Sequence, residues 1–328
     1  MAVEFSEFIL NHPQFKLLRE EKKNSRLTHA YILESADKLF VDNFSLLFAS
    51  MIFCNQEGAP CMSCVECQKV GLESHADLCI LPKEKSIVVD DVKMLIENSV
   101  LKPLESDCKV FIFKDFSNAT VQAQNKLLKI LETPPENVYI ILNVENINAV
   151  LPTIISRCKK IRLEKFDNET IKEIVRKNNP KVDVNVIAEA SGGSLQRALN
   201  FAQDAEFNDC YELAIFTLEN LKSSATLLSV SSKIVEKKNY FDNYLEILIS
   251  MLRDILLIRL RRENYVENKQ LLERLKTLSL EFNADCVDLI IKKIYAIKKQ
   301  LEFNCNPTVC IDNLLLYILE VKYLCNKQ

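Results

Sequence analysis

Four cysteines lie within fourteen residues of the sequence, at Cys54, Cys61, Cys64 and Cys67 in the stretch CNQEGAPCMSCVEC. Thiols this close together serve in redox pairs, disulfides, iron–sulfur clusters or structural metal sites. A redox site is normally a single Cys-x-x-Cys pair near the start of a helix, whereas here two such pairs share Cys64. Tetrahedral zinc suits the spacing and the Gly and Pro of the connecting turn, and an iron–sulfur cluster is the serious alternative.

The other eight of the twelve cysteines are scattered singly among apolar residues, as at Cys79, Cys108, Cys158, Cys286 and Cys310. The N-terminal stretch MAVEFSEFIL lacks the basic flank and the cleavage site of an export signal. No run of about 18 apolar residues predicts a membrane span. We therefore expect a cytoplasmic protein in which these cysteines are buried thiols and not disulfides.

Length and charge limit the remaining classes of protein. At 328 residues the sequence is long enough for two or three domains of about 100 to 150 residues each. A net charge of −3 gives no global basic footprint for nucleic acid, so any contact with DNA is local or shared with partners.

The first half alternates short apolar runs with amphipathic stretches, which is typical of an α/β domain with a mostly parallel sheet. Strands are expected at 30–33, 78–81, 110–113, 138–142 and 160–163. Helices are expected at 41–53, 89–99 and 119–132. Pro134 and Pro135 stop the last of these helices, because proline lacks an N–H and its ring clashes with the preceding turn.

Strands are no longer predicted after residue 167. A helix is expected to open at 168–173, the SGGS stretch at 191–194 interrupts the pattern, and 195–202 resumes it. Farther on, apolar residues recur at helical spacing in long segments, clearest at 244–260, 287–301 and 314–324. These segments predict an all-α domain, and their apolar faces indicate contacts with other subunits.

The loop after the first strand is where an α/β domain of this kind would hold a nucleotide. A phosphate-binding loop needs glycines, whose N–H groups wrap the phosphates, followed by Lys and Ser/Thr. The loop ESADKLF contains no glycine, and Gly58 is the first glycine of the chain. The loop's acidic residues Glu34 and Asp37 would also repel phosphate. Asp115 beside Lys114 is a weak magnesium site. We infer a nucleotide-binding fold that has lost nucleotide binding.

Three stretches carry a family resemblance: RLTHAYIL at 26–33, NKLLKILETPP at 125–135 and LPTIISRC at 151–158. In order and spacing they resemble the AAA+ subunits of bacterial DNA polymerase III clamp loaders, over about the first 200 residues. The closer likeness is to the branch that keeps the fold and the Ser-Arg-Cys motif without a working phosphate loop. The gamma/tau ATPase subunit would keep its glycines and an acidic Asp-Glu pair.

The resemblance implies three domains: an AAA+ core at 1–165 with a zinc module at about 54–75, a helical lid at 166–207 and an all-α collar at 208–328. It implies structural zinc on the four cysteines. It also implies a non-ATPase stator that assembles with gamma/tau and delta subunits, which together use ATP to open the sliding clamp and place it on primed DNA. The alternatives are an active gamma/tau-type ATPase with a degenerate phosphate loop and a stand-alone zinc-containing DNA-binding protein.

The resemblance gives a catalytic role to the motif of Ser156, Arg157 and Cys158, with Arg157 as the arginine finger that acts in trans. In the family this arginine reaches the ATP site of the neighbouring subunit, where its planar, permanently charged guanidinium neutralises charge on the γ-phosphate during transfer. Without the motif, a lone arginine is more often part of a surface ion pair of little energetic value. Asn143 and Arg197 match nucleotide-sensor positions, but in a chain without a nucleotide we expect them to be structural.

Overall fold

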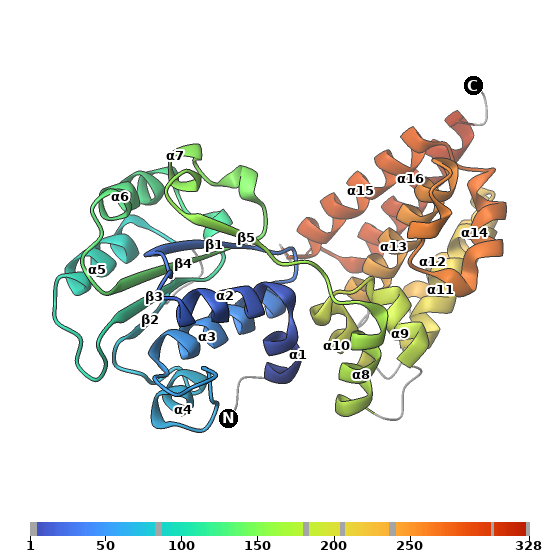
Figure 1. Cartoon of the computed structure of the whole chain (residues 1–328). Helices are drawn as coiled ribbons and strands as arrows, with labels where there is room; N and C mark the ends of the chain where they lie inside the picture. Colours follow the sequence, from blue (N-terminus) through green and yellow to red (C-terminus); the bar gives the residue numbers. More distant parts are fainter. Residues whose placement is uncertain are drawn as a thin grey trace. The chain divides into compact units, whose positions relative to one another are not determined.

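The computed structural model describes residues 5–82, 87–179, 184–203, 207–235, 241–302 and 305–325. The chain divides into two compact units, residues 1–165 and residues 166–328, which are drawn in Figure 1. Within the described ranges, no helix is both long enough and apolar enough to cross a membrane.

The first unit is a parallel sheet with helices on both faces. Its elements are α1 (Ser6–Asn11), α2 (Pro13–Lys23), β1 (Ala30–Glu34), α3 (Lys38–Phe53), α4 (Val65–Gly71), β2 (Leu78–Leu81), α5 (Val89–Ser99), β3 (Lys109–Phe113), η1 (Phe116–Asn118), α6 (Val121–Glu132), β4 (Val138–Val144), η2 (Ile147–Ala149), α7 (Pro152–Ile155) and β5 (Lys159–Arg162). The strands pair in the order β2-β3-β4-β1-β5, and every pair is parallel. The expected α/β core with a parallel sheet is confirmed.

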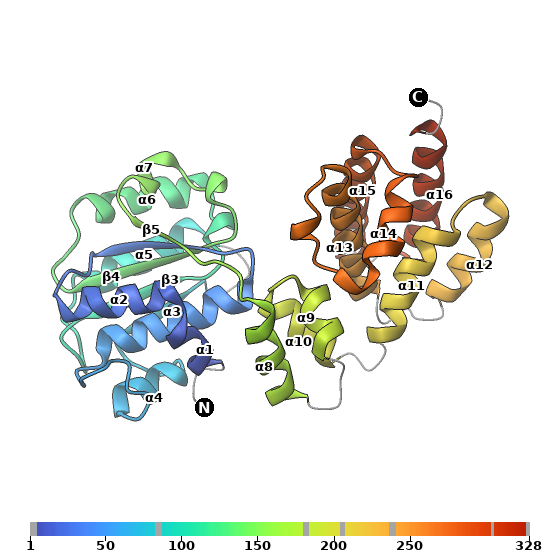
Figure 2. The same ribbon diagram turned by 45° about the vertical axis from the view of Figure 1, so that its right-hand side comes forward.

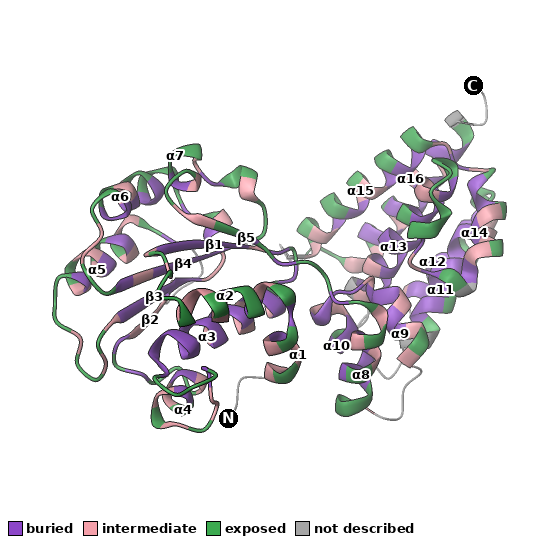
Figure 3. Ribbon diagram, in the orientation of Figure 1, coloured by how far each residue is buried: buried purple, intermediate pink, exposed green. Residues whose placement is uncertain are grey.

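Alternate residues of β1 point to opposite faces of the sheet, as the pleat of a strand requires. Ala30 and Ile32 join a core cluster that includes residues of α5 and α6. Tyr31 packs edge-on against Phe48 of α3, with the ring centroids 4.8 Å apart. Figure 1 shows α2 and α3 on one face and α5 and α6 on the other, and Figure 3 shows β1, β3 and β4 buried between them. Because both faces are covered, β1, β3 and β4 are nearly continuous apolar runs, whereas the edge strand β5 has the sequence KKIR.

Side-chain caps decide where two of the expected helices begin. α3 begins earlier than the apolar pattern predicts, because the Asp37 carboxylate accepts a hydrogen bond from the Phe40 N–H at 3.0 Å. α6 begins later, because the Thr120 hydroxyl accepts one from the Ala123 N–H at 3.2 Å. α6 ends before Pro134, as expected. The sequence pattern did not predict α1, α2 or α4.

The second unit is all helical in its described residues. Its elements are α8 (Asn168–Asn178), α9 (Val184–Ser191), α10 (Leu195–Gln203), α11 (Phe207–Asn220), α12 (Ser224–Val235), α13 (Phe241–Arg259), η4 (Glu263–Tyr265), η5 (Lys269–Leu271), α14 (Leu272–Ser279), α15 (Ala284–Glu302) and α16 (Pro307–Cys325). In Figure 2, α13, α15 and α16 run side by side as long rods, and α15 packs against both others. The expected all-α region is confirmed, whereas its division into a lid and a collar at residue 207 stays a prediction.

Among the described residues, the single cysteines depart from the expected buried thiols at Cys305, which is exposed, and at Cys286. Cys79, Cys108 and Cys158 are free and half-buried, and Cys310 is free and buried. Cys286 is buried but disulfide-bonded, so the expectation of a thiol is wrong there. A disulfide depends on which segment the fold brings within reach of the cysteine, and the sequence around a single cysteine does not contain that information.

Candidate functional site

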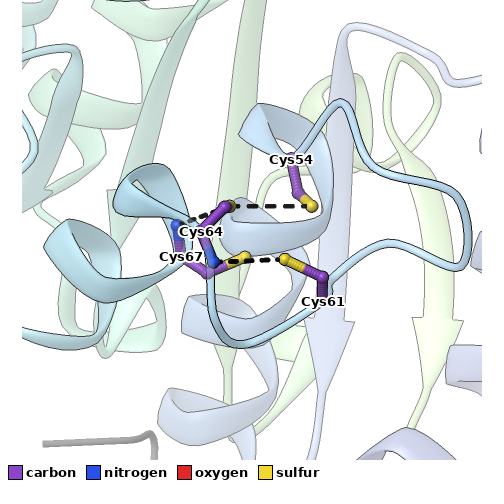
Figure 4. A group of neighbouring side chains, drawn as sticks. All are labelled: Cys54, Cys61, Cys64 and Cys67. Carbon is purple, nitrogen blue, oxygen red and sulfur yellow. Dashed lines mark hydrogen bonds between the residues drawn. The ribbon is translucent and has the colours of Figure 1, made fainter.

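The four cysteines of the 54–67 stretch meet at one point beyond the end of α3 (Figure 4). Cys54 caps the C-terminus of α3 and Cys64 is the N-cap of α4. All four Sγ atoms lie within 4.8 Å of one another, and those of Cys54 and Cys64 are 3.9 Å apart. Sulfur atoms at the corners of a regular tetrahedron are about 3.8 Å apart when each metal–sulfur bond is about 2.3 Å long. The cluster therefore fits a single metal ion.

Backbone N–H groups point at two of these sulfur atoms. Cys61 Sγ accepts a hydrogen bond from the Cys64 N–H at 3.3 Å, and Cys64 Sγ accepts one from the Cys67 N–H at 3.4 Å. Hydrogen bonds from the backbone and hydroxyl of Ser63, and then from Cys64, lower the pKa of Cys61 to about 6. Burial raises the pKa of Cys64 and that of Cys67. Of these three thiols Cys61 ionises most readily, and a metal ion would have to displace protons from Cys64 and Cys67.

Helix α2 supplies two basic side chains to the cysteine module. Arg19 Nε donates a hydrogen bond to the Ala59 carbonyl at 3.2 Å, in the loop between the first two cysteines. Lys22 Nζ donates to carbonyls at the end of α3, among them that of Cys54. Burial lowers the pKa of Lys22, and the neighbouring cysteines, chiefly Cys54, counteract this in part. A divalent metal held by four thiolates carries a net negative charge, which the Lys22 ammonium offsets.

A second group of possible ligands, Glu66, His75 and Glu105, lies beside the cysteine module. His75 is 2% exposed and its Nδ1 accepts a hydrogen bond from the Asp77 N–H at 3.1 Å. The ring proton is therefore on Nε2, which lies 2.7 Å from the Glu66 carboxylate and donates to it. The ring also stacks on Phe53, with the centroids 4.0 Å apart, so His75 connects α4 to α3. Both ring nitrogens are engaged in hydrogen bonds, and neither is free to bind a metal ion.

A cavity of about 110 Å³ lies at the carboxyl ends of β1 and β4, where an open α/β sheet would hold a ligand. Its lining residues are Ser35, Ala36, Lys38, Val41, Asp42, Asp115, Asn143, Val144 and Glu145. Lys38 Nζ lies 3.5 Å from the Asp115 carboxylate. Burial raises the pKa of Asp42. In this lining three carboxylates accompany one ammonium group, so the cavity disfavours the negative charge of a phosphate.

The N-terminus of α3 beside this cavity is already capped. Asp37 is 7% exposed and its carboxylate accepts the Phe40 N–H, one of the donors that a bound phosphate would use. Glu34, at the end of β1, pairs with Lys160 of β5 at 2.9 Å. The two acidic residues singled out in the sequence are therefore both held in place by protein partners.

Arg157 lies on the surface between the end of α7 and the start of β5, with its side chain 35% exposed. Its Nη1 donates to the Thr153 carbonyl at 2.8 Å and its Nη2 to the Glu132 carboxylate at 2.8 Å. Ser156 is exposed, and its hydroxyl donates to the Thr153 carbonyl at 3.0 Å. Cys158 packs against the core, and burial raises its pKa to about 12, so it remains a thiol. The surface ion pair expected of an ordinary arginine is thus present at Arg157.

The two positions matched to nucleotide sensors, Asn143 and Arg197, lie in different surroundings. Asn143 is 1% exposed and its amide donates to Asp42 at 2.8 Å and to Ser45 at 3.0 Å. Arg197 lies half-buried on α10. The sequence analysis did not single out Lys22 or Glu132, which contact Cys54 and Arg157. No motif marks Lys22, whereas Glu132 belongs to the NKLLKILETPP stretch and could have been found there.

A family model described as DNA polymerase III, delta subunit, matches residues 10–167, and one described as DNA polymerase III, delta subunit, C terminal, matches residues 209–320. The DNA polymerase III subunit delta' of Bacillus subtilis (strain 168) is 26% identical over 328 residues, which cover 98% of this chain and 100% of that protein. The subunit tau/gamma of Haemophilus influenzae is 27% identical over 192 residues, or 56% of this chain and 28% of that protein.

Among solved structures, a gamma subunit-related protein of Thermotoga maritima aligns with 93% of this chain at 18% identity and a TM-score of 0.46, and 99% of that protein is covered. The first family model covers the parallel sheet, and the second lies within helices α11 to α16. The delta' relative aligns along its entire length. This chain therefore belongs to the delta-prime family of DNA polymerase III subunits.

Proposed function

We propose that this chain is a non-ATPase stator of the clamp-loader complex and that it supplies Arg157 in trans to the ATP site of a neighbouring gamma/tau-type subunit. The complex, which would also contain a delta subunit, loads the sliding clamp onto primed DNA. The observation that carries this proposal is the surface position of Arg157 within its Ser-Arg-Cys motif. In the same chain, carboxylates line the cavity at the carboxyl ends of β1 and β4, where a phosphate would otherwise bind.

The chemistry required of Arg157 is modest. In phosphoryl transfer, negative charge spreads over the γ-phosphate oxygens, and a guanidinium that donates several N–H groups stabilises that charge. Two protein acceptors, the Thr153 carbonyl and the Glu132 carboxylate, hold the Arg157 guanidinium at the surface. Ser156 and Cys158 act through the local backbone: Ser156 bonds to the end of α7, and Cys158 anchors the segment to the core.

The residues at the carboxyl ends of β1 and β4 support the proposal that this chain has no ATP site of its own. A phosphate loop works because unpaired N–H groups and a lysine surround the phosphates. Here Asp37 takes an N–H at the start of α3, and Lys38 lies beside Asp115. Asn143 is bonded to Asp42, so the side chain at the sensor position has a structural partner.

We propose that the metal held by the four cysteines is zinc in a structural role. All ligand positions of a tetrahedral site are filled by sulfur, which leaves no open position for water or substrate. An iron–sulfur cluster would distribute the cysteines over several iron atoms and separate their sulfurs more widely than one ion does. Bound zinc would supply cohesion to a module that otherwise contains one short helix, α4.

We also propose that the helices from residue 208 onward form the collar through which the subunits assemble. Support comes from α16, where Val309, Leu316 and Tyr323 are 62%, 49% and 62% exposed. Their spacing of seven residues places them on one face of the helix, the pattern of a surface that packs against another helix.

The experiment that tests the catalytic role is ATP hydrolysis by a reconstituted loader containing the Arg157→Ala variant. Turnover at the site next to this chain should fall by about 10³-fold or more, as for other arginine fingers. The Arg162→Ala variant is a matched control, because Arg162 is also an exposed arginine of the first unit. Wild-type DNA-stimulated turnover in Arg157→Ala would refute the role.

A further inference from the structure

We propose that Glu132 is a positioning residue, which holds the Arg157 guanidinium in the orientation from which it reaches the neighbouring subunit's ATP. The inference rests on the proposed function of Arg157 and adds a second residue to it. The carboxylate of Glu132 and Nη2 of Arg157 are 2.8 Å apart. This ion pair joins the NKLLKILETPP stretch to the LPTIISRC stretch, which are separate segments of the sequence.

The contacts of the guanidinium group show how it is oriented. Nη1 donates to the carbonyl of Thr153 at 2.8 Å and lies 3.5 Å from the Ser156 hydroxyl. Nη2 donates to Glu132 at 2.8 Å. Within the described part of the chain, Nε and the second hydrogen of Nη2 have no partner, and these are the donors that remain for a phosphate. A guanidinium can donate through two nitrogens at once, which suits the oxygen atoms of a phosphate group.

Helix α6 also fixes the backbone from which Arg157 projects. Gln124 of α6 is 2% exposed, and its side-chain oxygen accepts the Leu151 N–H at 2.9 Å, at the start of α7. Its side-chain nitrogen donates to the Ala149 carbonyl at 3.1 Å. The same helix therefore holds α7 at its beginning through Gln124 and the arginine after α7 through Glu132. With the backbone fixed, only the torsions of the Arg157 side chain are left to order.

The exposure of the pair suits a positioning role. The Glu132 and Arg157 side chains are 52% and 35% exposed, so the pair contributes little to folding stability. A phosphate carries more negative charge than one carboxylate and can compete for the guanidinium when ATP is present. Until then, Glu132 restricts the rotamers of a long side chain, which reduces the entropy that would be lost when Arg157 engages the ATP.

The test uses the reconstituted loader with Mg²⁺ and ATP, and compares Glu132→Gln, Arg157→Ala and the double variant with wild type. Glu132→Gln should lower DNA-stimulated kcat about twofold to fivefold, the range that an exposed ion pair supports, with KM for ATP unchanged. Glu132→Asp should recover part of the loss. In the Arg157→Ala background, Glu132→Gln should have no further effect, because the two residues act as one unit.

Glu136→Gln is the matched control, since Glu136 is an exposed glutamate just beyond α6 and its replacement makes the same change of charge. Full turnover in Arg157→Ala would overturn the proposed function and this inference with it. If Arg157→Ala is impaired, the inference alone is overturned by wild-type or higher kcat in Glu132→Gln, or by an equal loss in both backgrounds. The melting temperature of each variant separates loss of folding from loss of positioning.

Discussion

The Asn143 side-chain amide donates a hydrogen bond to the Asp42 carboxylate at 2.8 Å, and thereby links the end of β4 to the first turns of α3. The same amide donates to Ser45 at 3.0 Å. A polar side chain from the central strand is thus used to fasten α3 to the sheet. This bond lies where a nucleotide would be bound, beside a cavity that Asp115 and Glu145 also line.

The isolated chain should not bind ATP saturably in the micromolar range. Placing a triphosphate beside Asp42, Asp115 and Glu145 brings like charges together, and Asp37 has already taken an N–H at the start of α3. Equilibrium titration with a fluorescent ATP analogue, with and without Mg²⁺, measures this. Saturation at micromolar concentration would instead favour an active gamma/tau-type ATPase.

The purified protein should be colourless and contain about one zinc ion per chain. Cys64→Ser should weaken zinc binding by about a hundredfold or more, since even replacing a residue that only supports a ligand costs about 10- to 100-fold. Serine can still cap α4, so the helix content should change little. Metal analysis measures zinc, with the exposed Cys305→Ser as the control that should retain it. A brown protein that contains iron would contradict the zinc assignment.

Replacing Lys22 with Met should make the metal easier to remove. The variant keeps most of the side-chain volume but loses the donor to the Cys54 carbonyl and the positive charge beside the thiolates. Release of zinc to a chromogenic chelator should accelerate about 10- to 100-fold, as for other residues that support metal ligands. Lys23→Met is the control, because Lys23 is exposed. Equal release rates for wild type and Lys22→Met would show that Lys22 does not stabilise the site.

Asp77 should make the first unit sensitive to acid. It is 3% exposed, and burial alone would raise its pKa, but N–H groups of Glu105, Leu104 and Ser106 outweigh burial and lower the pKa. Its contribution to stability is therefore complete above the unfolded-state pKa of about 3.9 and is lost as the pH falls through the folded-state value. Asp77→Asn should cost about 2 kcal/mol at pH 7, and this difference should shrink below about pH 4.

Urea unfolding at pH 7 and at pH 3 measures the stability that Asp77 contributes. Asp107→Asn is the control, because Asp107 is exposed and should give a difference near zero at both values. A difference between wild type and Asp77→Asn that stays constant with pH would mean that the carboxylate is not the charged acceptor of these bonds.

Local sequence predicted the five strands of the sheet and singled out the four cysteines as candidate metal ligands. The strand expected at 78–81 and the helix expected at 89–99 are found with these bounds. The spacing of the cysteines within one short segment was sufficient to indicate a metal site, because a chain of that length can close on itself around one ion. The N-cap residues Asp37 and Thr120 decided where α3 and α6 begin. A pattern of apolar residues does not report such polar caps.

Only the tertiary structure decided which distant residues meet. Glu132 and Arg157, Asp42 and Asn143, and Lys22 and Cys54 each come from different elements. Hydrophobic periodicity reports which face of an element is buried, but it does not report which polar groups at the ends of elements become neighbours. Those contacts follow from strand order and helix packing, and they distinguish an arginine held at the surface from one that is free in solvent.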